Sequence, residues 1–567
     1  MSNYIQDFYN KIHKSNQDET KTFLVFNTAC FGDNLVCNAL CQNIKKIYPD
    51  SKVVFIVNRP FLEVAKYQKD VDDVVIYDKK GEHKGLKGFF KFLKNFKYKN
   101  SYAAFITYRN VRNVFVAALS GAKHIYEGKK LNNKKTAQEQ ILLLLGKLTK
   151  EPLLNLPIEY NADSSIPEHL IGILSKDDNY IGLSCLTKKT TKDIPIDTTV
   201  ELIKKFNIAG EYKILLLGTG DNNQEYADKL QQAGCEFINL VNKTSIYELA
   251  QVLKNCKALI SADTGTMHFG YALKIPTLAI FYERETLPTW SPDPNLYNTI
   301  TLSSFQTAEN IYSSCQILIG NEKEKKLSVV IPTLQKNTDL LINLLKILEQ
   351  DNAVDEIILI DNSRKGLSYT NNKLKIIIPE KNLFVNPSWN YGTKFAKNNI
   401  VALLNDDIMI APKFCSNVIN KMDYKMGCVG ACAECLLETE NIVYNVEDSI
   451  DMKLTPIDLI TYHWGVAIFY YKSSFRQIPD EIKIFRGDDW LFYENKSTSR
   501  QNYYIEGQKI YHYGSLTSRS KALKPIGRRD RYYYRKYTKK WYQHYFDYEK
   551  LSDGYRLTIF GCKIIVK

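Results

Sequence analysis

The chain has 567 residues, which is too many for a single hydrophobic core and predicts roughly two to four domains. Hydrophobic residues make up 44% and charged residues 24% of it, the balance of an ordinary globular protein, and its apolar runs are far too short to span a membrane. The net charge of +14 favours anionic partners such as nucleotides, phosphorylated glycolipids or an anionic membrane surface, and no nucleic-acid-binding signature accompanies it.

The polar N-terminus, Met1–Lys21, lacks the apolar core of a signal peptide, so we expect a cytoplasmic protein. The twelve cysteines form no repeating framework and are expected to be reduced. Two groups of cysteines lie close enough in sequence to be weighed as metal sites, but neither has a matching second half or a His pair at zinc spacing. Buried structural cysteines are therefore the expectation for both groups, which are Cys30, Cys37 and Cys41, and Cys428, Cys432 and Cys435.

Short apolar strands alternate with helical stretches through the first 305 residues, a pattern typical of parallel α/β sheets. This pattern predicts two Rossmann-like halves, about 22–160 and 178–305, within a domain over 1–305. The expected strands include Phe23–Asn27, Val53–Val57, Tyr180–Ser184, Lys213–Leu217, Ala258–Ser261 and Thr277–Phe281, and the expected helices include Asp33–Tyr48 and Thr198–Phe206.

The following stretch, 306–326, ends in the polar and charged sequence Gly320–Lys326 and is interpreted as a linker. A new α/β cycle then begins, and it predicts a further domain over 327–545 with a C-terminal extension over 546–567. Its expected elements are the strands Leu327–Pro332, Glu356–Asp361 and Ile400–Leu404 and the helix Thr338–Gln350.

Polar residues follow two strands of the first part, where ligands bind in open α/β sheets. Gly32 and Asp33 come after the first strand, where the Asp is either a helix N-cap or a catalytic base. The segment Asp263–His268 opens a helix after another strand, and its helix-terminal amides, Gly265 and hydroxyls suit a phosphate. A helix cap with a structurally satisfied His268 is the alternative.

Together these residues resemble the ADP-heptose:lipopolysaccharide heptosyltransferases, glycosyltransferase family 9, over about residues 22–305. The resemblance implies a metal-independent GT-B fold in which Asp33 is the general base. Lys192 and the amides of Thr264, Gly265 and Thr266 would hold the leaving diphosphate, since a cation and a helix dipole can replace a metal ion. The family's Lys-Arg-Trp-Pro element appears only as Lys192–Pro195, which puts heptose as the sugar in doubt. The resemblance further assigns Ser184, Asp263 and His268 to donor binding, with the loop Leu217–Asp221.

A second constellation lies in the expected domain over 327–545. The pair Asp406–Asp407 follows an apolar strand, and neighbouring carboxylates repel each other unless a cation lies between them. Mg²⁺ or Mn²⁺ with a diphosphate fits such a pair, and an acidic surface turn is the alternative. Thr333, Asp361 and Asn390 also stand at the ends or beginnings of expected elements.

With the pair Asp488–Asp489 and with His512, this constellation resembles glycosyltransferase family 2, an inverting GT-A family, over about 327–545. The resemblance implies that Asp361 contacts the nucleotide base, that Asp407 holds the metal ion, and that Asp406 faces the metal or the donor sugar. It makes Asp489 the expected base, with Asp488 close behind. Thr333 and Asn390 are expected at the donor, and His512 is either a ligand of the metal or phosphate or a structural residue.

The tail Arg528–Tyr548 interleaves Arg and Lys with Tyr and Trp. It resembles tails common in family 2, which favours a helix packed on the core. Contact with an anionic inner membrane can coexist with that packing, and a nucleic-acid groove would show similar chemistry.

The sequence thus predicts an inverting, bifunctional glycosyltransferase that uses nucleotide-diphosphate sugars, with a metal ion in the GT-A domain alone. Its acceptor is expected to be a lipid-linked surface glycan, such as lipooligosaccharide or capsule, at the cytoplasmic face of the membrane. In one alternative only the GT-A domain is catalytic and the first domain is a binding module. In another the basic tail makes the chain a nucleic-acid-binding protein.

Overall fold

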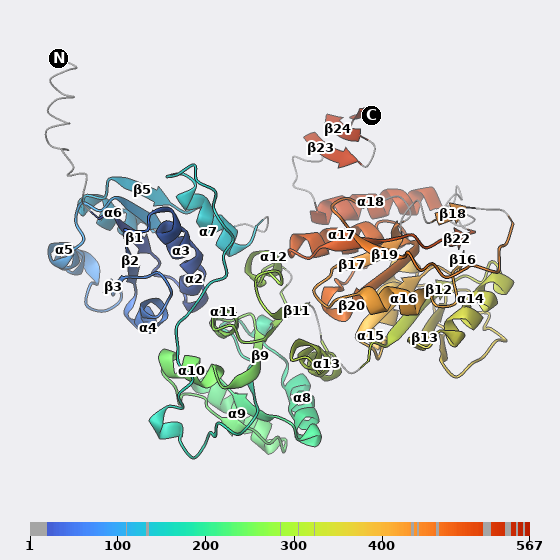
Figure 1. The fold of residues 1–567 in the computed structure, drawn as a ribbon, viewed down its shortest axis with the longest axis horizontal. Coiled ribbons are helices and arrows are strands. Elements are labelled where there is room, and N and C mark those ends of the chain that lie inside the picture. Colours follow the sequence, from blue (N-terminus) through green and yellow to red (C-terminus); the bar gives the residue numbers. More distant parts are fainter. Residues whose placement is uncertain are drawn as a thin grey trace. The chain divides into compact units, whose positions relative to one another are not determined.

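The computed structural model describes residues 20–108, 110–131, 135–283, 285–303, 306–321, 324–431, 436–438, 441–460, 464–513, 523–538, 546–551, 554–559 and 562–566. By its internal contacts the chain divides into two compact units. Figure 1 labels the helices and strands. Unit 1 consists of Met1–Thr187, Glu211–Lys229 and Phe237–Pro276, and unit 2 of Lys188–Gly210, Leu230–Glu236 and Thr277–Lys567. No helix of the described part of the chain is long and apolar enough to cross a membrane.

Unit 1 opens with a five-stranded parallel sheet of order β3-β2-β1-β4-β5. Its central strand β1 is buried on both faces, because helices cover each of them, and it therefore reads as a continuous apolar run. The strands are β1 (Thr22–Phe26), β2 (Lys52–Val57), β3 (Asp73–Ile76), β4 (Ala103–Ile106) and β5 (His124–Glu127), and the helices are α2 (Phe31–Val36), α3 (Asn38–Ile47), α4 (Leu62–Lys66), α5 (Gly85–Asn95), α6 (Val111–Leu119) and α7 (Ala137–Leu145).

The other strands of unit 1 lie in the order β9-β6-β7-β8 and are also parallel. In both sheets the chain runs outward in one direction and then returns to the other side of its first strand. The resulting switch points, between β1 and β4 and between β6 and β9, are where α/β sheets bind ligands. The elements are β6 (Tyr180–Ser184), β7 (Lys213–Leu216), β8 (Ile238–Asn239), β9 (Cys256–Ala262), α10 (Ile246–Leu253) and α11 (Gly265–Ala272), with α9 (Asp221–Gln232) ending just outside the unit.

Unit 2 contains an eight-stranded mixed sheet of order β14-β13-β12-β15-β20-β17-β21-β19. Strand β12 pairs in parallel with β13 and β15, and β20 runs antiparallel to β15 and β17. The strands are β12 (Leu327–Thr333), β13 (Val354–Asp361), β14 (Leu374–Ile377), β15 (Ile400–Leu404), β17 (Cys428–Ala431), β19 (Lys453–Ile457), β20 (Ala467–Tyr471) and β21 (Asn502–Glu506). Trp464, Trp490 and Tyr470 are buried in the core beside this sheet.

Five helices of unit 2 accompany this sheet, and two smaller sheets complete the part of the chain after residue 326. A short sheet has the order β16-β22-β18, and the last strands form an antiparallel sheet in the order β23-β24-β25. The helices are α14 (Thr338–Gln350), α15 (Val385–Phe395), α16 (Phe414–Lys421), α17 (Gly487–Ser497) and α18 (Lys524–Thr538), and the strands are β16 (Ile408–Met409), β18 (Leu436–Glu438), β22 (Ile510–His512), β23 (Phe546–Leu551), β24 (Gly554–Ile559) and β25 (Cys562–Val566).

The prediction of parallel α/β sheets is confirmed, but two details are wrong. The single helix expected over Asp33–Tyr48 is interrupted at Cys37, which caps α2 at its end and α3 at its beginning. The stretch interpreted as a linker contains α13 (Ala308–Leu318), whose residues Ile311 and Cys315 are fully buried. Its apolar residues recur at helical spacing, a signal that the polar surroundings obscured.

Further elements of unit 2 precede α13 in the chain. The helix α8 (Ile196–Ala209) packs with α13, and the strands β10 (Thr277–Phe281) and β11 (Thr299–Ser303) pair in parallel. A one-turn helix, α12 (Leu287–Trp290), lies between these two strands in sequence.

Of the four described cysteines in the two groups, three are buried as expected and one, Cys30, is not. Cys37, Cys41 and Cys428 are buried, and burial raises the pKa of the Cys37 and Cys428 thiols to about 12. Cys30 is exposed, and Cys432 and Cys435 lie outside the described residues. No group of three metal-binding side chains occurs among the residues that the structure describes.

Candidate active sites

The two motifs predicted in the first part of the chain meet in unit 1, where α2 packs against α11. A Cβ atom added to Gly32 would lie 2.5 Å from Cδ2 of the buried His268 ring, and one added to Gly265 would lie 2.4 Å from Cδ1 of Phe31. Phe31 also packs edge-on against Phe269, with ring centroids 5.2 Å apart. Both glycines are therefore required by close approach, and this contact brings together loops more than 200 residues apart in sequence.

Asp33 is the third residue of α2, and Cys30 occupies the N-cap position. The carboxylate reaches back to accept the amide of Cys30 at 3.2 Å, through Oδ2. Asp33 is thus half of a capping arrangement without being the N-cap, and its half-buried side chain stands after the central strand β1. The N-cap alternative is therefore wrong for Asp33, because Cys30 is the N-cap, and the position stays compatible with a catalytic base.

The segment Asp263–Thr266 is half-exposed and follows β9 directly. Thr264 stands at the N-cap of α11 but makes no side-chain cap bond to the first-turn amides. These amides and the positive end of the helix dipole suit a phosphate group. Ser184 ends β6, is buried, and pairs in register with Ser261, which places it beside this segment. His268 contacts the hydroxyl of Tyr271 through Nδ1.

Lys192 belongs to unit 2 and lies in a short 3₁₀ turn, Thr190–Lys192. Its Nζ is 3.9 Å from Glu283 Oε2, and the same carboxylate accepts Nζ of Lys189 at 3.1 Å and Oγ1 of Thr191 at 2.6 Å. Hydrogen bonds from Thr191 and Lys189 lower the pKa of Glu283. Glu283 was not predicted from the sequence, because it lies 91 positions after Lys192.

A cationic group in unit 1 was also missed. Lys79 Nζ donates to Thr28 Oγ1 at 2.5 Å, and Asn113 Nδ2 donates to the same oxygen at 3.2 Å. Burial, and next the charge of Arg112, lowers the pKa of Lys79 to about 8. Lys79 follows β3 and Thr28 follows β1, so both residues lie beyond the ends of strands of the first sheet. A positive charge at this place would stabilise a glycan acceptor that carries negative charge.

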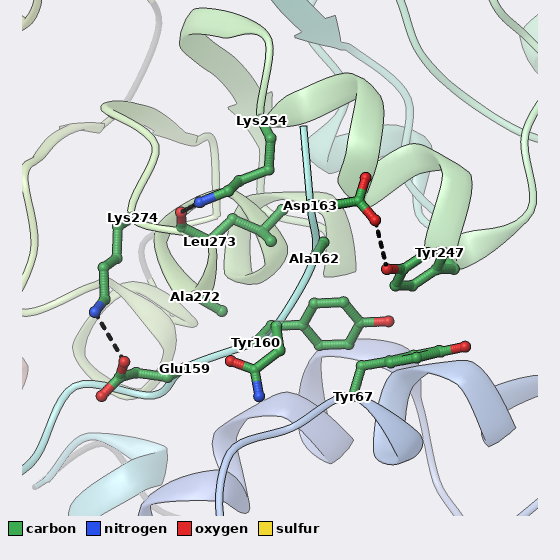
Figure 2. Close-up of a pocket in the computed structure, with 11 residues that line it drawn as sticks. Tyr67, Glu159, Tyr160, Ala162, Asp163, Tyr247, Lys254, Ala272, Leu273 and Lys274 are labelled. Carbon is green, nitrogen blue, oxygen red and sulfur yellow. Dashed lines mark hydrogen bonds and ion pairs between the residues drawn. The ribbon is translucent and has the colours of Figure 1, made fainter. Parts of the chain in front are cut away.

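Figure 2 shows a hollow of about 470 Å³ in unit 1, which none of the predicted site residues line. The rings of Tyr67 and Tyr247 pack against each other in it, with centroids 4.2 Å apart and planes tilted by 33°. Its charged groups satisfy one another, since Glu159 pairs with Lys274 at 2.8 Å and Asp163 accepts the hydroxyl of Tyr247 at 3.3 Å. The hollow is thus distinct from the predicted sites.

In unit 2 the segment between β15 and β16 carries Asp406 and Asp407, which contact residues at the ends of β12 and β22. Thr333, at the end of β12, donates to Asp406 Oδ2 at 2.5 Å, and burial followed by the charge of Asp407 raises the pKa of Asp406 to about 6. The pairing of β16 with β22 places His512 Nε2 3.3 Å from Asp407 Oδ1. That oxygen is buried and accepts no hydrogen bond from any described residue. A buried carboxylate oxygen without a donor fits a cation, so Asp407 with His512 suits the expected metal ion.

Two residues predicted at the donor are held by other parts of unit 2. Asn390 donates to the carbonyl of Ile478 at 2.7 Å and accepts its amide at 3.0 Å, so both ends of its side-chain amide serve the fold. Asp361 is fully buried and accepts four bonds from residues 363–366. The expected contact of Asn390 with the donor is not supported by this geometry. For Asp361 to bind the nucleotide base, as expected, it has to give up one of these four hydrogen bonds.

The acidic pair at the start of α17 is asymmetric. Arg486 Nη1 donates to both carboxylate oxygens of Asp489, at 3.1 and 3.0 Å. Burial, and next the charge of Asp489, raises the pKa of Asp488 well above its usual range. Asp488 packs on Gly465, where an added Cβ would lie 2.7 Å from the Asp488 Cβ.

Comparison with known proteins finds matches to two different families in two parts of the chain. Residues 130–313 match the profile "Glycosyltransferase family 9 (heptosyltransferase)", and residues 328–482 match "Glycosyl transferase family 2". Lipooligosaccharide heptosyltransferase 2 of Campylobacter jejuni subsp. jejuni serotype O:6 is 35% identical over 79 residues, which are 13% of this chain. The chain spans a quarter of the length of the curated relatives that it matches.

Two solved structures illustrate the similarity of the first part. A family 9 glycosyltransferase from Veillonella parvula is 19% identical, with 54% of this chain and 99% of that chain covered at a TM-score of 0.48. The ADP-heptose heptosyltransferase II of E. coli is 15% identical, with 54% and 100% covered at a TM-score of 0.43. The chain therefore contains two glycosyltransferase family domains in tandem, a family 9 match at 130–313 followed by a family 2 match at 328–482.

Proposed function

We propose that the chain is a bifunctional inverting glycosyltransferase that adds two sugars to a lipid-linked bacterial surface glycan, with a GT-B enzyme over about 1–305 and a GT-A enzyme over about 327–545. The observation that carries the first activity is the contact of Gly32 and Phe31 with α11, which brings a carboxylate near a phosphate-binding helix end. The match to lipooligosaccharide heptosyltransferases supports a lipooligosaccharide acceptor over capsule.

At the first site Asp33 takes the proton of the acceptor hydroxyl, whose oxygen attacks the anomeric carbon of the donor as the nucleoside diphosphate leaves. The amides at Thr264–Thr266 meet the negative charge that develops on the diphosphate. The resemblance to family 9 makes Lys192 the proposed cation for the same leaving group. The absence of the Trp and Arg expected beside Lys192 leaves the sugar open, with a heptose-type donor the first to be tried.

At the second site Asp407 and His512 would hold Mg²⁺ or Mn²⁺, with Asp406 beside them. The ion would neutralise the donor diphosphate, and the carboxylates of this chain orient it. We assign the proton transfer from the acceptor to Asp488, ahead of Asp489, because Arg486 occupies both oxygens of Asp489. A base with a raised pKa is also better matched to a proton acceptor near neutral pH.

Binding of nucleoside diphosphates to the full chain tests this proposal. We expect one of ADP, UDP, GDP and dTDP to raise the thermal transition without added metal, through the first site, and one to do so only with Mn²⁺. At a hundredfold excess over Kd the stabilisation is about 2.7 kcal/mol. A chain that none of the four stabilises, with or without Mn²⁺, would contradict both assignments.

We also propose peripheral contact with an anionic membrane through α18. Its exposed residues Arg528, Arg529, Arg531 and Lys536 accompany the exposed Tyr532. Liposomes with anionic headgroups should float the chain, less so at high salt, because screening weakens surface attraction. Changing these four cations to Gln should reduce flotation, whereas the same change at the exposed Lys346, Lys365, Lys413 and Lys421 should not. Equal loss in both variants would assign the effect to net charge.

A further inference from the structure

A carboxylate in the basic tail does not face solvent. Asp530, on α18, is fully buried and accepts three backbone amides at 2.9 Å each, from Lys483 through Oδ1 and from Ile484 and Phe485 through Oδ2. Three N–H donors satisfy the oxygens of this buried carboxylate, and the bonds fix the backbone that supplies them. Asp530 therefore ties α18 to the residues just before α17.

The residue that follows this segment is under strain. Arg486 adopts a left-handed backbone conformation, with φ of 70°, which a residue with a side chain keeps only when its surroundings hold it there. From that position its guanidinium holds Asp489 and lies 5.9 Å from the centre of the Tyr534 ring, within cation–π range. Tyr534 stands one turn beyond Asp530 on the same face of α18.

We propose that α18 is a positioning element of the family 2 site, in which Asp530 and Tyr534 together fix Arg486 on Asp489 and so leave Asp488 as the proton acceptor. The proposal rests on the proposed function of this site. Asp530 and Tyr534 touch neither acceptor nor donor in this scheme and act through Arg486. Further packing keeps the helix in place, since Tyr537 meets Trp490 edge-on at 6.0 Å and an added Cβ on Gly527 would lie 3.3 Å from Phe485.

The test uses the full chain with Mn²⁺ and measures release of nucleoside diphosphate from UDP-glucose, UDP-galactose and dTDP-rhamnose. The donor that the unaltered chain consumes fastest is then used for all variants. Asp530→Asn removes the charge and one amide bond, and we expect kcat to fall at least tenfold with the donor KM within twofold. Tyr534→Leu keeps the apolar packing but removes the ring beside Arg486, and kcat should fall severalfold, again without a change of KM.

Tyr537→Phe is the matched control, because it removes only an exposed hydrogen bond from the same helix to Glu481, and kcat should not change. If Asp530→Asn lowers the thermal transition by many degrees, its loss of kcat reports loss of folding, and the kcat of Tyr534→Leu alone tests the proposal. Unchanged kcat in Tyr534→Leu and in a folded Asp530→Asn would overturn the proposal, as would a rise in donor KM that matches the loss of kcat. If Asp488→Asn has no effect, or the unaltered chain consumes none of the three donors, the proposed function of the site fails and the positioning role with it.

Discussion

Chelation of divalent cations should abolish transfer by the second site and leave transfer by the first unchanged. At the second site Asp406 and Asp407 are adjacent, and Asp407 Oδ1 is buried without a hydrogen bond from the described residues. Two carboxylates and a diphosphate repel each other unless an ion lies between them. At the first site the diphosphate would instead meet the amides at the start of α11.

The measurement separates the activities within the full chain. A chain with Asp33→Asn reports the second activity, and one with Asp488→Asn reports the first, each assayed in EDTA and after Mn²⁺ is restored. Asp407→Asn should imitate chelation, whereas Asp423→Asn, an exposed acid elsewhere in unit 2, should not. An EDTA-sensitive first activity would refute its metal-independent mechanism, and an EDTA-resistant second activity would refute Asp407 as a metal ligand.

Loss of a general base should lower each activity alone by about a hundredfold to ten-thousandfold in kcat. We expect this from Asp33→Asn for the first activity and from Asp488→Asn for the second. Asp489→Asn should cost much less, because in the structure its carboxylate holds Arg486. A pH profile of kcat/KM then distinguishes the two acids of the pair.

Burial and the charge of Asp489 raise the pKa of Asp488. An ordinary Asp carboxylate titrates near pH 4, so the acid limb of the pH profile of the second activity should lie at a higher pH than that. The rate falls as pH drops through this limb because a protonated base accepts no proton. In Asp489→Asn the limb should move to lower pH, since a neighbouring negative charge is gone and Arg486 is released. A large loss in Asp489→Asn with little loss in Asp488→Asn would identify Asp489 as the base.

Short-range patterns in the sequence predicted much of the fold. Apolar runs and the polar residues at their ends predicted the parallel sheets, and helix α14 has the bounds expected for it. The contact between Gly32 and His268 could only be expected by resemblance, because nothing in either motif indicates the other. The roles of Asn390 and Asp361 were assigned from the resemblance to family 2, and the structure shows hydrogen-bond partners that the resemblance does not reveal.

Residues whose partners lie far away in sequence were missed. Asp530 reads as one acid among cations in the tail, and its partners lie 45 to 47 residues earlier. The contacts of Glu283 with Lys192 and of Lys79 with Thr28 likewise form only in the folded chain, so neither residue stood out in the sequence. The linker prediction failed for a related reason: the buried face of α13 consists of a few apolar residues in a polar stretch.

The position of α18 bears on how shortened forms of this protein are designed. The family 2 profile ends at residue 482, before Arg486, Asp488, His512 and Asp530. A fragment cut at that boundary keeps Thr333, Asp406 and Asp407. It lacks the proposed base, Asp488, and every residue proposed to position that base. Such a fragment could bind a nucleotide and still fail to transfer sugar, so an inactive truncation that stops short of Thr538 says nothing about whether this half of the chain is an enzyme.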